Sequence, residues 1–87
     1  MPGKIHFELT SHAVTVMAER KIPLAWVERV LMRPERIEPD RVDPELHHAL
    51  GRIAERDDRI LRVVYNINTE PWRVVTAYFD RAMRGKL

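Results

Sequence analysis

Apolar side chains recur at helical spacing in two short stretches near the start of the chain. Thr10 and Ser11 can each cap the first helix, which we expect to end near Arg20, before the proline at position 23. Pro23 suits the first turn of a second helix, which Pro34 ends. The predicted inward-facing residues are Ala13, Val14, Met17 and Ala18 in the first helix and Leu24, Val27 and Leu31 in the second.

Three later stretches have the alternating, β-branched and aromatic composition of strands. They span residues 46–54, 60–66 and 72–79, and polar turns at 55–58 and 68–71 separate them. Short connections of this kind join antiparallel neighbours. The pattern therefore predicts an antiparallel meander of three or four strands.

Two shorter segments are also extended in pattern. Residues 4–9 alternate apolar with polar side chains, which permits a short strand before the first helix. Ile37 lies in a second such piece, where Pro39 lacks an N–H and is therefore restricted to a sheet edge or a loop. Together these elements predict one α+β domain over residues 1–87, with two N-terminal helices packed on one face of the sheet.

Alternation divides the last two strands into two rows of side chains. We assign one row to the helices because the other carries polar groups that favour water. The row predicted beneath the helices contains Leu61, Val63, Val75 and Phe79. The row predicted on the open face contains Arg62, Trp72, Thr76 and Tyr78. Such a face is a candidate ligand surface.

The amino-acid composition excludes several classes of site but does not identify a ligand. The 87 residues include no cysteine, which excludes disulfides, thiolate zinc sites and cysteine nucleophiles and fits a reducing cytoplasm. No apolar run resembles a signal peptide or membrane span, so we expect a cytoplasmic protein without a membrane partner. The net charge is +2, and most of the 15 basic residues are arginine, which permits an RNA partner.

Five pieces of sequence in this order resemble an uncharacterised bacterial family that neighbours the BrnT toxins, in the RelE-like toxin superfamily. The resemblance covers roughly residues 9–78. The chain lacks the Trp-Asp opening, the Lys-His-Gly junction and the Arg/Glu-rich C-terminal helix of BrnT itself. The matching pieces are Ser11-His12-Ala13, Glu19-Arg20 followed by Ile22, Val27 to Glu35, Arg62-Val63-Val64-Tyr65, and Val74-Val75-Thr76-Ala77-Tyr78.

The resemblance implies a RelE-like fold and a toxin of a type II toxin–antitoxin pair that cuts RNA without a metal or cofactor. Such cleavage requires a proton acceptor, a proton donor and a cation for the phosphate. Arg62 is the predicted cation, since its planar fork fits phosphate oxygens. His12 is the predicted acid–base group, and Thr76 and Tyr78 are predicted to position or polarise a phosphate oxygen. Structural roles, such as a helix-cap histidine and cross-strand contacts, are the competing interpretation.

A second set of residues is predicted to bind RNA outside the reacting centre. His47 and His48 are adjacent on a strand, so only one can share the face of Arg62, and alternation alone does not say which. No histidine has metal-ligand spacing with a supporting carboxylate. The predicted RNA-binding residues are Arg20, His48, Arg52, Trp72 and Arg81.

Three functions remain open on the sequence alone. The first is an RNA endonuclease toxin neutralised by an antitoxin protein. The second is a non-catalytic module of the same fold that binds RNA or a protein. The third is that the open face forms a homodimer interface.

Overall fold

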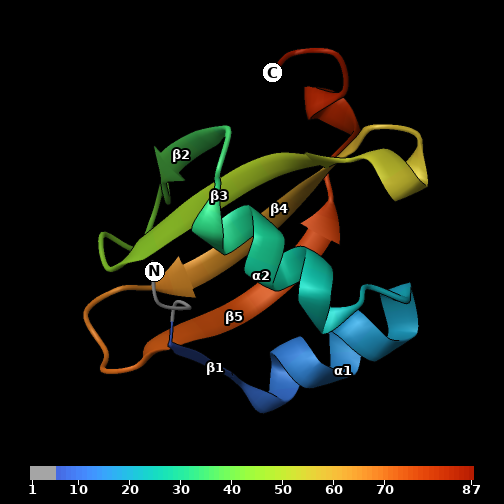
Figure 1. The fold of residues 1–87 in the computed structure, drawn as a ribbon. Coiled ribbons are helices and arrows are strands. Elements are labelled where there is room, and N and C mark those ends of the chain that lie inside the picture. The colour runs from blue at the N-terminus through green and yellow to red at the C-terminus, as the bar shows by residue number, and fades with distance from the viewer. Residues whose placement is uncertain (1–5) are drawn as a thin grey trace, which may run out of the picture.

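In a computed structural model of the chain, which describes residues 6–87, two helices lie against one face of a five-stranded sheet (Figure 1). No helix in these residues is long and apolar enough to cross a membrane. The elements, in chain order, are β1 (Phe7–Leu9), α1 (Ser11–Arg20), α2 (Leu24–Met32), β2 (Arg36–Pro39), β3 (Leu46–Ile53), the 3-10 turn η1 (Ala54–Arg56), β4 (Arg59–Asn66), β5 (Trp72–Phe79) and the 3-10 turn η2 (Arg81–Met83).

The sheet is mixed, with strand order β1-β5-β4-β3-β2. Strands β2 to β5 form the predicted antiparallel meander, and the proline-containing strand β2 lies at its edge as expected. The prediction of three or four antiparallel strands was wrong, because β1 adds a fifth strand parallel to β5, with Phe7 opposite Trp72. The predicted extended segment at 4–9 is confirmed over Phe7–Leu9, and residues 4–5 lie outside the described part of the chain.

Helix α1 turns a slightly different side to the sheet from the one predicted. Val16 is buried, whereas Val14 is 53% exposed. Two contacts explain this rotation: the backbone N–H of Thr10 donates to a β5 carbonyl (3.0 Å), and the Arg20 guanidinium donates to the carbonyl of Ala77 (2.8 Å). Because both ends of α1 are tied to β5, the residues spaced by helical turns between them face the core.

Helix α2 covers the middle of the sheet, as Figure 1 shows. Val27 and Leu31 are buried as predicted, but Leu24 is 52% exposed. Ile22, in the link between the helices, is buried instead. The apolar core thus lies between the helices and the sheet, with contributions from both helices and from β3, β4 and β5.

A bulge between β4 and β5 changes the predicted rows of side chains. The register shifts between Val64 and Tyr65, so that β5 contains one residue more than β4 across this interval. Val74 is therefore fully buried in the core, and Val75 is not, which is the reverse of the prediction. Trp72 also packs against the core on the helix side, stacked on Tyr65 with ring centroids 5.2 Å apart.

Candidate functional site

Strands β3, β4 and β5 bring three of the predicted site residues together on the face opposite the helices. Arg62 of β4 lies across from Tyr78 of β5, and its Nη1 lies 2.9 Å from Nδ1 of His48 on β3. A hollow of about 300 Å³ opens beside these side chains. We call it the central hollow; its lining residues are Glu38, Pro39, Asp40, Arg41, Val42, His48, Arg62, Tyr78 and Asp80.

Arg62 is the most buried charged group in this hollow, with only 11% of its side chain exposed. Its Nε and Nη2 contact Oδ2 of Asp80 at 2.9 and 2.8 Å, and its Nη1 donates to Oε1 of Glu38 at 3.0 Å. Burial alone would lower the pKa of Arg62, but the hydrogen bonds to Glu38 and Asp80 outweigh it and raise the pKa. The guanidinium of Arg62 therefore stays protonated, and the two carboxylates balance its positive charge.

The contacts of His48 fix its tautomer. Its Nδ1 faces a guanidinium nitrogen of Arg62 that can only donate, so Nδ1 must accept. The proton of the neutral ring is then on Nε2, which donates to Oδ1 of Asp40 at 2.7 Å. His48 is thus a neutral imidazole oriented by a carboxylate, an arrangement that also occurs in acid–base catalysis.

Asp40 is held in the ionised state by the loop that follows β2. Backbone N–H groups of Asp43 and Val42 donate to its Oδ2 at 2.9 and 3.1 Å. The pKa of Asp40 is lowered to about 2, chiefly by the hydrogen bond from Asp43, then by those from His48 and Val42. The Asp40–His48 pair is therefore anchored to the backbone.

The structure resolves which histidine faces the open side. His48 lies in the central hollow, whereas the ring of His47 faces Tyr65 on the helix side, with centroids 6.1 Å apart. Sequence reasoning missed the three carboxylates of Glu38, Asp40 and Asp80. A signal was present, because a partly buried strand arginine requires anionic partners.

The other two predicted catalytic residues, Thr76 and His12, do not line the central hollow. Thr76 shares the open face, opposite Val64 on β4, and is half-buried. His12 is exposed on α1, on the side of the sheet that the helices cover. The fold thus places Thr76 near Tyr78 and keeps His12 out of the central hollow.

The remaining predicted RNA-binding residues are dispersed. Arg20 is hydrogen-bonded to the sheet backbone, and Trp72 packs on the helix side. Arg52 pairs with Glu35, with Nη2 and Oε1 2.8 Å apart. Arg81 is exposed in η2, beside a second hollow at the C-terminal end of β5.

In residues 6–87, no group of three His, Asp or Glu side chains is arranged to hold a metal ion. No curated protein and no solved structure matches the chain. Residues 9–79 match the family described as "Domain of unknown function (DUF4258)", a description that states no activity and no relation to BrnT or RelE-like toxins. Because this match spans well over half of the chain, the protein belongs to that family.

Proposed function

We propose that the protein is the RNA-cleaving toxin of a type II toxin–antitoxin pair and that the central hollow is its catalytic site. The observation that carries the proposal is the convergence of His48, Arg62 and Tyr78 from three adjacent strands on a hollow that the helices leave open. These side chains supply the acceptor, cation and donor that metal-independent RNA cleavage needs.

The proposed reaction uses the 2′-hydroxyl of the substrate as its nucleophile. His48 takes the 2′-hydroxyl proton while the 2′-oxygen attacks phosphorus, and Arg62 stabilises the charge that develops on the phosphate oxygens. Tyr78 donates its proton to the departing 5′-oxygen as that P–O bond breaks. The products are a 2′,3′-cyclic phosphate and a 5′-hydroxyl, and water returns the proton from His48 to Tyr78.

The resting contacts place a condition on this mechanism. Nδ1 of His48 is occupied by Arg62, so it becomes a base only after that guanidinium nitrogen turns toward another anion. A substrate phosphate between Arg62 and Tyr78 would act in this way, in competition with Glu38 and Asp80. The substrate thus both binds the cation and releases the base.

The same contacts favour a second candidate, a non-catalytic module that binds RNA or a protein. The charge of Arg62 is already neutralised by Glu38 and Asp80, and both ring nitrogens of His48 are engaged. Closed ion-pair networks of this kind also serve structural roles. On this alternative the face binds a partner and no bond is cleaved.

Inducible expression with matched variants separates the two candidates. We expect the wild type to arrest growth, Tyr78→Phe to abolish arrest by removing one hydroxyl, and Arg33→Ala, an exposed residue on the helix side, to retain it. Purified wild type should cleave RNA in the presence of EDTA and leave 2′,3′-cyclic phosphate ends. RNA or protein binding without cleavage or arrest would support the second candidate, and equal activity in wild type and Tyr78→Phe would exclude Tyr78 as the donor.

A further inference from the structure

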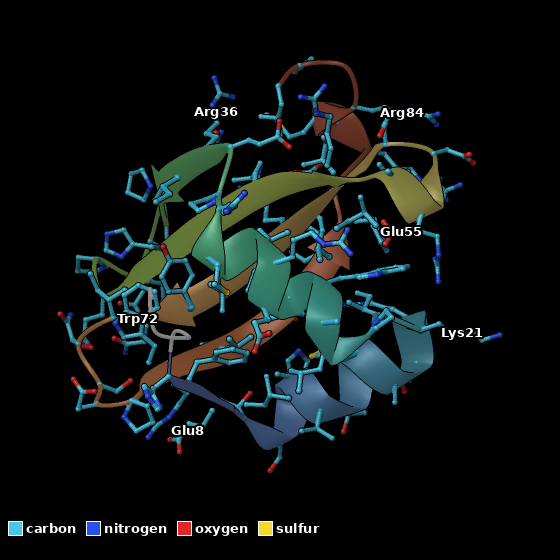
Figure 2. The ribbon with its side chains drawn as sticks, in the orientation of Figure 1. Glu8, Lys21, Arg36, Glu55, Trp72 and Arg84 are labelled. Carbon is cyan, nitrogen blue, oxygen red and sulfur yellow. The ribbon has the colours of Figure 1, made fainter. Side chains whose placement is uncertain are left out.

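A second hollow, of about 200 Å³, lies where β4 begins and β5 ends. Its lining includes two apolar residues, Ile60, which is buried, and Phe79, which is half-buried. Figure 2 places Arg84 beside the C-terminal turn, far along the sheet from Trp72. We call this site the arginine hollow; its lining residues are Arg59, Ile60, Phe79, Asp80, Arg81 and Arg84.

The arginine hollow carries positive charge that the protein does not neutralise. Within residues 6–87, the guanidinium groups of Arg59 and Arg81 form no ion pair or hydrogen bond, and Arg84 makes one long contact, 3.4 Å, to a backbone carbonyl. Asp80 is the single carboxylate in the lining, and its Oδ2 is bound by Arg62. Its Oδ1 accepts from the backbone of η2 at 3.0 Å.

Three other exposed arginines are paired with glutamates, whereas exposed Arg33 and Arg41 have no ion pair within residues 6–87. Arg29, Arg52 and Arg73 each lie within 3.3 Å of a glutamate oxygen. What distinguishes the arginine hollow is that guanidinium groups from two separate segments line one hollow together with apolar residues, which suits an anion with a flat, partly apolar body. A nucleotide has both parts, a phosphate and a base that stacks on guanidinium planes.

We propose that the arginine hollow binds the backbone phosphates of single-stranded RNA, one or more nucleotides away from the phosphate at the central hollow. The two hollows share Asp80 as a lining residue and are therefore neighbours at the end of β5. The choice of RNA rests on the proposed function, whereas the anion site itself rests on the unpaired arginines. An acidic protein segment is the competing occupant.

Binding of a fluorescent octauridylate whose 2′-hydroxyls are methylated, so that it cannot be cleaved, tests this site by anisotropy over a range of KCl concentrations. We expect Arg59→Ala/Arg81→Ala to raise the Kd about tenfold at low salt and to reduce the slope of log K against log salt by about 1.4, because two phosphate contacts are lost. The control Arg33→Ala/Arg73→Ala removes the same charge from exposed positions elsewhere and should change the Kd less than about twofold.

Equal weakening by the two double variants, or no RNA binding by the wild type, would overturn the inference. Tighter binding of a polyglutamate peptide than of the RNA, lost in Arg59→Ala/Arg81→Ala, would assign the hollow to an acidic protein segment instead. Cleavage of unmodified RNA is measured separately. RNA binding that needs Arg59 and Arg81, without any cleavage, would support this inference and overturn the proposed nuclease. Cleavage by the wild type, with RNA binding unchanged in Arg59→Ala/Arg81→Ala, would support the nuclease and overturn this inference.

Discussion

The central hollow and the arginine hollow share Asp80 and are both lined by arginine, yet their arginines are in opposite states. Arg62 is nearly buried and is held by two carboxylates and an imidazole. Arg59 and Arg81 are exposed, and no carboxylate in residues 6–87 pairs with them. A buried charge must be neutralised by the fold itself, whereas an exposed one is solvated and free to meet a ligand. A ligand of Arg62 must therefore compete with two internal carboxylates, whereas a ligand of Arg59 or Arg81 displaces no internal partner.

The largest effect on stability is expected from removal of the buried guanidinium of Arg62. Arg62→Ala should lower the free energy of unfolding by about 3 kcal/mol, because two partly buried carboxylates lose their counter-ion. Urea denaturation followed by circular dichroism measures the change. Adding Glu38→Gln and Asp80→Asn to an Arg62→Met background should recover part of the loss, and an Arg62→Ala protein as stable as Arg33→Ala would contradict a structural role for this cluster.

A smaller effect is expected at the imidazole. His48→Ala should cost about 1 kcal/mol of unfolding free energy, because Asp40 and Arg62 each lose one hydrogen-bond partner. Thermal unfolding of this variant can be compared with His12→Ala, which alters an exposed histidine on α1. The same melting temperature in both variants would show that the His48 contacts add no stability.

The ionisation of Asp40 gives a pH-dependent test. Its pKa is about 2 in the folded protein and about 3.9 in an unfolded chain. Its contribution to stability is therefore present above about pH 4 and is lost as the pH falls through about 2. We expect the melting temperature of Asp40→Asn to fall less steeply between pH 5 and 2 than that of the wild type, with Glu45→Gln as the exposed control. Parallel curves for wild type and Asp40→Asn would rule out this linkage.

The smallest expected effect on stability is in the arginine hollow. Arg59→Ala/Arg81→Ala should change the unfolding free energy by no more than about 0.5 kcal/mol, because no internal contact within the described chain depends on these guanidinium groups. Urea denaturation beside the wild type gives the comparison with Arg62→Ala. Destabilisation as large as in Arg62→Ala would mean that the two hollows do not differ in the way described.

Local signals explain which parts of the fold were predictable from the sequence. A cap at Thr10 and the prolines at 23 and 34 fixed both helices to within a residue or two, because capping and backbone sterics act between neighbours in the chain. The strand at Phe7–Leu9 was predicted as a short extended segment or strand, without its parallel partner. Its partner Trp72 is distant in sequence, and a three-residue pattern does not specify a pairing direction.

Sequence patterns alone were enough to predict most elements and, on one side of the bulge, which face of the sheet each side chain lies on. Alternation places Arg62 and Tyr78 on the face away from the core residues Leu61 and Val63. The three-dimensional fold, in contrast, sets the bulge in which one extra residue moves Val74 into the core. It also decided that His48, and not its neighbour, meets Arg62. Alternation is a property of consecutive residues, whereas bulges, register and ion partners depend on contacts between distant segments. The Glu38, Asp40 and Asp80 carboxylates around Arg62 belong to this second kind, so the charge state of the site follows from the fold.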